Sequence, residues 1–145
     1  MRIKQFDIWV ADLNPRFGTE TGKTRPVVII QTDLLNKFHP STIICPITTN
    51  VKPDADILRV PLTKGSSKLN EDSDIMIDQI RTIDNKRLLK KLGELSQKDR
   101  EIIKANLAIV LDIWKQKNGH QTFNIFYSTT ILLLCTEFSD TIFNW

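Results

Sequence analysis

Short apolar runs separated by polar turns cover the first two thirds of the chain. Residues 6–13 are rich in aromatic and β-branched side chains, which predicts a strand. Residues 27–31 form a continuous apolar run, which predicts a strand buried on both faces. Further strands are predicted at 42–48, 57–62 and 74–80. Pro46 lacks a backbone donor and therefore predicts a bulge or a sheet edge within its strand.

The apolar spacing becomes helical in the next part of the chain. Residues 84–92 predict a short helix that ends at Gly93. Ser96 followed three residues later by Asp99 resembles a capping box. After it, apolar residues fall on one helical face: Ile103, Leu107, Val110, Leu111 and Trp114. Strands followed by an amphipathic helix predict an α+β domain built as a β-barrel with a C-terminal helix.

The last 28 residues differ in composition from the rest of the chain. Residues 118–145 contain no Lys or Arg and include the apolar run 131–135. Such a segment does not stay safely exposed on its own. We therefore divide the chain into a domain at 1–117 and an atypical apolar extension at 118–145. The extension either packs on the core or on a partner, or has no functional consequence.

Charge and cysteine content narrow the class of protein. Residues 1–117 carry 20 basic and 15 acidic groups, a net charge of +5, which suits a polyanionic partner but also simple solubility. Cys45 and Cys135 lie far apart and form neither a disulfide framework nor a metal cluster, which favours a reducing cytoplasm. No apolar stretch approaches the roughly 20 residues that span a bilayer, so no membrane association is expected.

Few residues are placed for familiar catalytic chemistry. His39 and His120 have no catalytic neighbours, and Asp54 and Asp56 lack further metal ligands. No phosphate-binding glycine loop is present. The sequence therefore predicts a site without metal or cofactor.

What remains is a guanidinium and hydroxyl groups at the ends of strands. Arg25 follows a glycine-bearing loop at 16–24, and Thr48 and Thr49 end another strand. Read without any family, Arg25 pairs with Glu20 or Asp12, and the threonines hydrogen-bond turn backbone. A guanidinium and hydroxyl groups would be sufficient to cleave RNA. The 2′-hydroxyl of RNA is the nucleophile, so the protein need only orient and stabilise the phosphate. A guanidinium suits that task through bidentate contacts.

Several motifs, taken in order, resemble those of the MazF/PemK-type toxins. They lie at residues 7–9, 12–15, 18–20, 25–29, 46–49, 78–84 and 86–88. The resemblance implies an SH3-like β-barrel of the MazF/Kid/CcdB kind that assembles as a homodimer. It implies a toxin that cuts single-stranded RNA at short sequences, leaving a 2′,3′-cyclic phosphate and a 5′-hydroxyl. It also implies a cognate acidic antitoxin that folds across the basic groove.

The resemblance assigns roles to particular residues. The arginine of the Arg-Pro motif matches Arg25 and the catalytic threonine matches Thr48. Thr19 stands where some PemK-branch members have histidine, and Met76 stands where that branch has a second arginine.

The RNA contacts are expected on the two loops at 16–24 and 49–56 and on the Asp-Gln motif at 78–79. Single-stranded RNA is read by stacking and by hydrogen bonds to base edges. Phe17 is the stacking candidate, or else a loop anchor packed on the barrel, and the charged side chains contact phosphates or stay idle. The complete set of expected RNA-binding residues is Phe17, Thr19, Glu20, Lys23, Thr49, Lys52, Asp78, Gln79 and Arg81.

Two other functions compete with this interpretation. A protein-binding toxin of the gyrase-poisoning CcdB type shares the barrel, and the chain ends in Asn144-Trp145 as such toxins end near a tryptophan. A relative that binds RNA without cutting it is the other alternative, and salt-dependent binding without products identifies it.

Overall fold

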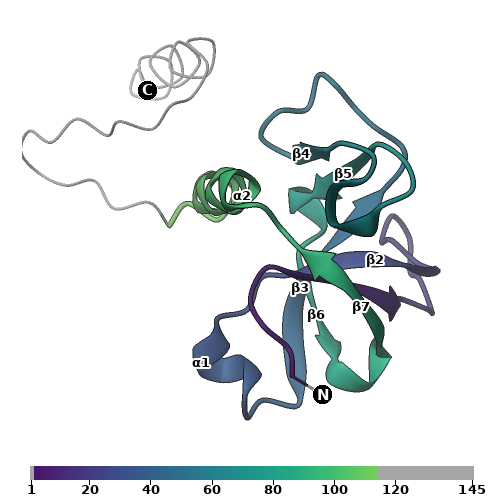
Figure 1. Ribbon diagram of the computed structural model, residues 1–145, viewed down its shortest axis with the longest axis vertical. Helices are drawn as coiled ribbons and strands as arrows, with labels where there is room; N and C mark the ends of the chain where they lie inside the picture. The colour runs from purple at the N-terminus through teal and green to yellow at the C-terminus, as the bar shows by residue number, and fades with distance from the viewer. Residues whose placement is uncertain (1, 114–145) are drawn as a thin grey trace, which may run out of the picture. The chain divides into compact units, whose positions relative to one another are not determined.

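Seven antiparallel strands and one long helix make up residues 2–113, the part of the chain that the computed structural model describes (Figure 1). The strands are β1 (Asp7–Asp12), β2 (Thr24–Ile29), β3 (Ser41–Thr48), β4 (Arg59–Leu62), β5 (Ser73–Met76), β6 (Arg81–Asp84) and β7 (Leu88–Glu94). The helices are α1 (Asp33–Asn36) and α2 (Gln97–Val110), with single 3₁₀ turns η1 (Ser66–Lys68), η2 (Ile77–Gln79) and η3 (Asn85–Arg87). The predicted α+β class, with a barrel-like antiparallel sheet and a closing helix, is confirmed.

β3 pairs with three other strands, β2, β5 and β6. The strand order is β4-β5-β3-β2-β1-β7, and β6 also pairs with β3. The first half of β3 pairs with β6 and its last two residues pair with β5. Pro46 is buried in the gap between these two pairings. Pro46 thus lies where the partner of β3 changes from β6 to β5, while on the other side of β3 it pairs with Val27 of β2. The proline is therefore inside the sheet and not at its edge.

The central strands are buried on both faces, as the continuous apolar run predicts. Val27, Val28 and Ile29 are all fully buried, because successive side chains of β2 enter opposite core clusters. One cluster includes Val28, Cys45 and Ile103 of α2. The other includes Val27, Ile29, Ile44 and Leu88, on the opposite face of the strands. The sheet therefore lies between two cores.

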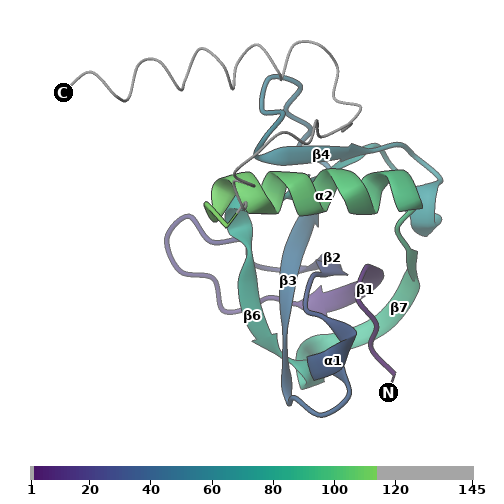
Figure 2. The same cartoon turned by 90° about the vertical axis from the view of Figure 1, so that its left-hand side faces the viewer.

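Helix α2 begins where the capping signal predicts. Ser96 Oγ accepts a hydrogen bond from the Asp99 amide at 3.2 Å, which satisfies one of the free amides of the first turn. In Figure 2, α2 crosses in front of the sheet beside β4. Ile103 and Leu107 are buried there, but Leu111 is 46% exposed. The predicted apolar face is thus buried only in its N-terminal half, and Trp114 lies outside the described residues.

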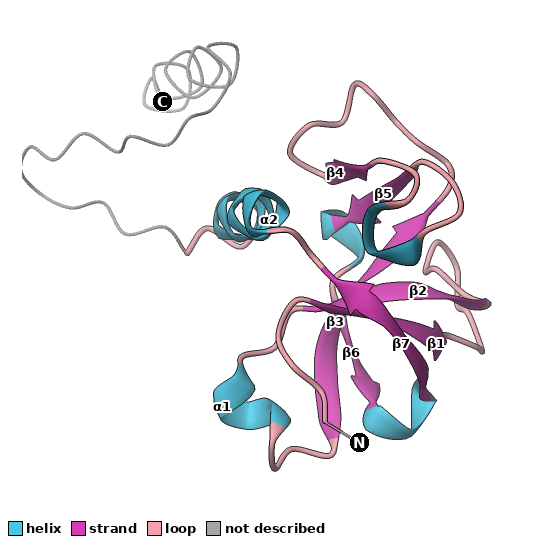
Figure 3. Cartoon of the chain, viewed as in Figure 1, coloured by secondary structure: helices cyan, strands magenta, loops and turns pink. Residues whose placement is uncertain are grey.

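The helix predicted at residues 84–92 is wrong. This stretch closes β6, passes through the η3 turn and continues as β7 (Figure 3). The Asp84 carboxylate accepts the Lys86 amide at 2.8 Å and caps the short turn. Leu88 then pairs with Ala11 of β1 and is buried, while Leu89 is exposed. Pairing with β1 overrides the local helix propensity of the lysines and leucines.

Other boundaries differ from the prediction by a few residues. The strand expected at 57–62 begins only at Arg59, and the strand expected at 74–80 ends at Met76 before the η2 turn. The sequence pattern gave no sign of α1, whose first turn is capped by Thr32. The expected boundary after residue 117 and the extension at 118–145 lie outside the described residues.

Candidate active site

Arg25 and Thr48 lie on neighbouring strands at the same end of the sheet. The antiparallel register of β2 and β3 pairs Val27 with Pro46. Continued by two residues, this register sets Arg25 opposite Thr48. Directly opposed residues of an antiparallel pair project from the same face. The two residues that the sequence selects as catalytic thus lie two residues beyond the last β2–β3 pair, on adjacent strands, and both are half-buried.

The Arg25 guanidinium is fixed at one nitrogen and open at the others. Its Nε donates to the Gly22 carbonyl at 2.8 Å. Within residues 2–113, its terminal nitrogens hold no hydrogen bond or ion pair, so neither Glu20 nor Asp12 is its partner. Burial lowers the pKa of Arg25, and the positive charge of nearby Arg81 lowers that pKa further. This arrangement leaves a desolvated cation with free donors, which favours an anionic ligand.

The Thr48 hydroxyl has the local role that a turn threonine usually has. Its Oγ1 accepts a hydrogen bond from the Asn50 amide at 3.2 Å. The hydroxyl proton is not used in this bond and stays available for a ligand. Thr49, the next residue, is exposed at the start of the following loop. Thr48 is thus held by its own turn while its proton can point away from it.

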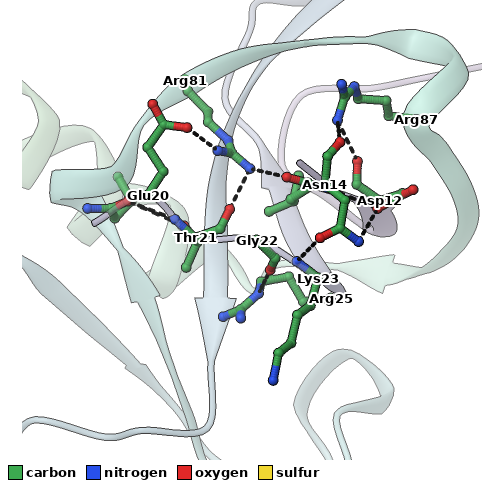
Figure 4. Close-up of polar contacts among 11 residues, drawn as sticks. Asp12, Asn14, Glu20, Thr21, Gly22, Lys23, Arg25, Arg81 and Arg87 are labelled. Atoms are coloured by element: carbon green, nitrogen blue, oxygen red, sulfur yellow. Dashed lines mark hydrogen bonds and ion pairs between the residues drawn. The ribbon is translucent and has the colours of Figure 1, made fainter. Parts of the chain in front are cut away.

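Side chains from η2 and β6 bind the base of the loop between β1 and β2 (Figure 4). Gln79 Oε1 accepts both the amide and the hydroxyl of Thr21, each at 3.3 Å. Arg81 Nη2 donates to the Thr21 carbonyl at 2.7 Å and to the Leu13 carbonyl at 3.4 Å. Arg81 Nη1 lies 3.5 Å from Glu20 Oε2. Gln79 and Arg81, expected to contact RNA, thus have partners within the chain.

The other end of the same loop is bound by β1 and by Arg87. Arg87 Nη1 donates to the Asp12 carbonyl at 3.2 Å and to the Asn14 carbonyl. Asn14 Oδ1 accepts the Lys23 amide at 3.0 Å, so the two ends of the loop are joined. The side chain of Lys23 remains exposed. The loop predicted at 16–24 is therefore held at its base.

The tip of this loop is exposed. Phe17 is 83% exposed, and Thr19 is also exposed. Phe17 therefore does not pack on the barrel as a loop anchor among residues 2–113. An exposed aromatic ring is available for stacking.

A buried carboxylate anchors the second loop, which follows Thr48. Asp74 is 1% exposed and pairs with Thr48 in the β3–β5 ladder. Its Oδ2 accepts the Lys52 amide at 2.7 Å. The Lys52 side chain is exposed, in a loop that contains further exposed residues. One carboxylate thus connects the strand of Thr48 to the loop expected to read RNA.

Asp78 makes none of the hydrogen bonds to Thr21 and instead forms an ion pair with Arg59. Arg59 pairs with Met76 in the β4–β5 ladder, and its side chain is 12% exposed. The sequence gave no signal for Arg59, because no motif includes it. Asp74 and Arg87 were likewise missed, since each acts on backbone groups far away in sequence. Only the strand register reveals these contacts.

No gathering of three or more His, Cys, Asp or Glu side chains that could hold a metal ion occurs among residues 2–113. In the same part of the chain, no helix is long and apolar enough to cross a membrane.

The sequence profile of the PemK-like, MazF-like toxins of type II toxin–antitoxin systems matches residues 4–111. The chain belongs to this family. It is 44% identical over 95 residues to a protein named Endoribonuclease MazF from Staphylococcus epidermidis, an alignment that covers 66% of this chain and 79% of the relative. The MazF/PemK resemblance and the expectation of an enzyme are thereby confirmed: the chain is a homologue of an endoribonuclease.

Solved structures show the same fold at low sequence identity. A MazF crystal structure from Deinococcus radiodurans aligns with a TM-score of 0.66 at 18% identity, covering 77% of this chain and 98% of that one. A mycobacterial endoribonuclease solved in complex with its cognate antitoxin aligns with a TM-score of 0.60 at 17% identity, covering 77% of this chain and 94% of that one. These similarities confirm the MazF-type fold.

Proposed function

We propose that this MazF-type toxin is an endoribonuclease that cleaves single-stranded RNA at short sequences without a metal ion. The observation that carries the proposal is the Arg25 guanidinium, half-buried and open at its terminal nitrogens, on the strand beside Thr48. Burial strengthens the interaction of such a cation with a phosphate, because less water screens it. The family match and the relative named Endoribonuclease MazF support the same activity.

The reaction needs no nucleophile from the protein. The 2′-oxygen of the ribose attacks the adjacent phosphorus and loses its proton, and the bond from phosphorus to the 5′-oxygen breaks. The 5′-oxygen gains a proton, which leaves a 2′,3′-cyclic phosphate and a 5′-hydroxyl. Arg25 stabilises the charge that develops on the phosphoryl oxygens. Thr48 donates a hydrogen bond from its free hydroxyl to the same oxygens.

RNA lies across the two loops in this proposal. Phe17 stacks on a base, and Lys23 and Lys52 neutralise phosphates, since all three are exposed. Of the other expected RNA-binding residues, the proposal retains Thr19, Glu20, Thr49, Asp78 and Gln79. The enzyme acts in the cytoplasm as a homodimer and is neutralised by an acidic antitoxin, as the mycobacterial neighbour is bound by its own antitoxin.

Two substitutions test the active site. Arg25→Ala and Thr48→Ala should each reduce cleavage of a long synthetic RNA by at least about a hundredfold, as loss of a transition-state donor does. Arg100→Ala is the matched control, because Arg100 also donates its Nε to a backbone carbonyl at 2.9 Å, that of Leu95. Gel electrophoresis and end mapping measure the products. Wild-type cleavage by both Arg25→Ala and Thr48→Ala would remove these assignments.

The same preparation tests the remaining parts of the proposal. Cleavage should persist in EDTA, and the upstream fragments should carry cyclic phosphate ends. Cleavage only after metal is added would contradict the metal-free mechanism. Inhibition of gyrase without RNA cleavage would instead favour the CcdB-type function. RNA binding that weakens with salt but yields no products would identify a non-cleaving relative.

A further inference from the structure

We propose that Arg81 positions Arg25 through the backbone of Thr21 and Gly22, and that it does not bind an RNA phosphate. This inference rests on the proposed nuclease activity for its catalytic consequence. The observations that lead to it are the contacts around Thr21 and the contact between Gly22 and Arg25 (Figure 4). Sequence reasoning assigned Arg81 to phosphate binding, so the structure changes the role of this residue.

Thr21 has partners for all of its polar groups. Its amide and hydroxyl donate to Gln79, and its carbonyl accepts from Arg81. A peptide held from both sides has little freedom to rotate. Gly22 follows directly and is buried, and its carbonyl accepts the Nε of Arg25. The Arg81 guanidinium therefore fixes the orientation of Arg25 through the backbone of Thr21 and Gly22.

The donors of Arg81 are directed at the protein. Its Nη2 bonds the carbonyls of Leu13 and Thr21, which belong to the two ends of one loop. Its Nη1 faces Glu20, and its Nε is buried with no hydrogen-bond partner among residues 2–113. The side chain is only 22% exposed. A planar guanidinium can hold two carbonyls at fixed spacing, whereas a single ammonium cannot do so with the same geometry.

The charge of Arg81 supports the same role. Arg25 and Arg81 are close enough for the charge of Arg81 to lower the pKa of Arg25. Glu20 pairs with Arg81 and not with Arg25. Within residues 2–113, the terminal N–H groups of Arg25 therefore stay available to a ligand. Arg81 thus holds Arg25 in place while its own charge is paired with Glu20.

The first measurement separates a positioning residue from a phosphate contact. Arg81→Ala is compared with the parent on an RNA fragment mapped as cleaved and on its uncleavable 2′-fluoro analogue. We expect kcat to fall by about a hundredfold, because a displacement of about 1 Å has that effect. The Kd of the analogue should stay within about twofold, and its salt dependence should not change. A phosphate contact would instead reduce the log–log salt slope by about 0.7 and leave kcat at saturation unaltered. That result overturns the proposal.

Two further variants isolate the geometry. Arg81→Lys keeps the positive charge but loses the planar guanidinium that binds the two carbonyls. We therefore expect kcat to remain at least about tenfold below the parent. Full kcat in Arg81→Lys would show that charge alone suffices, contrary to the proposal. Arg87→Ala is the matched control, since Arg87 binds the backbone at the opposite end of the same loop and does not contact Thr21. Its kcat should stay within about threefold, and a loss equal to that of Arg81→Ala would contradict the route through Thr21.

A second readout does not depend on RNA cleavage. NMR of isotope-labelled arginine reports the exchange of the Arg25 Nε proton, which the Gly22 carbonyl protects. We expect this exchange to be at least about tenfold faster in Arg81→Ala and unchanged in Arg87→Ala. Equal exchange in the parent and in Arg81→Ala would overturn the positioning role. If the parent cut no RNA, the nuclease proposal would fail while this measurement still decided what Arg81 does.

Discussion

Arg25 combines two properties that an exposed arginine lacks. A single backbone bond fixes the direction of its guanidinium, and partial burial with a nearby like charge lowers its pKa. The Gly22 carbonyl provides the backbone bond, and burial followed by the charge of Arg81 lowers the pKa. The sequence could select Arg25, because it matches the arginine of the Arg-Pro motif in the MazF/PemK resemblance. It could not identify the partner of Arg81, since a bond to a carbonyl 60 residues away leaves no periodic pattern.

Cys45 offers a prediction at the same scale. It is fully buried, and burial together with the nearby Asp78 carboxylate raises its pKa to about 12. In the unfolded chain the thiol ionises from about pH 8.5, whereas in the folded chain it stays protonated. Unfolding therefore releases a proton above that pH, and stability should fall by about 1.4 kcal/mol per pH unit until about pH 12.

The measurement is urea unfolding of the parent and of Cys45→Ala at about pH 8 and pH 10. The parent should lose about 2 kcal/mol more than the variant between these conditions. Other alkaline groups, including Cys135, are common to both proteins and cancel in the comparison. An identical loss in both proteins would show that Cys45 does not titrate in this way.

Among the elements, those formed by long-range pairing were the hardest to predict. The central strands were predicted because their apolar runs are buried on both faces, as Val27 and Val28 show. The capped start of α2 was predicted because its signal is local. β7 was mistaken for a helix, since its lysines and leucines favour helix and only the pairing with β1 makes it a strand. The ion pair of Lys91 with buried Asp7 of β1 supports the same pairing.

The strand assignment of β7 is tested by two adjacent leucines. Leu88 is 5% exposed and Leu89 is 58% exposed, as alternation along a strand requires. Leu88→Ala should destabilise the fold by about 2–5 kcal/mol, and Leu89→Ala by less than about 0.5 kcal/mol. Chemical denaturation measures both. Similar losses at the two positions would fit a helical turn better than a strand.

At the scale of the whole molecule, residues 2–113 contain two core clusters. The cluster beneath α2 runs from Phe6 to Leu107, and the cluster on the other face runs from Ile3 to Leu88. Among residues 2–113, the last member of either cluster is Leu107. This agrees with the family match, which ends at residue 111. The homodimer and the division after residue 117 remain predictions.

A chain that ends at Lys117 tests that division. Because every cluster member within residues 2–113 precedes this point, the shortened protein should fold with a Tm within about 4 °C of the parent, equivalent to less than about 1 kcal/mol. Its RNA cleavage and its mass by light scattering should also match the parent. A changed activity or oligomeric state would show that residues 118–145 cover part of the dimer or RNA surface.

Asp74 has a consequence for how enzymes of this design can diversify. One buried acid joins the strand of Thr48 to the amide of Lys52, and Arg81 does the equivalent for the loop before Arg25. Both loops are thus clamped at their roots, while tip residues such as Phe17 are unconstrained. Mutations at the tips can accumulate without disturbing the reaction centre, so a new preference for RNA sequence can evolve at little cost in turnover.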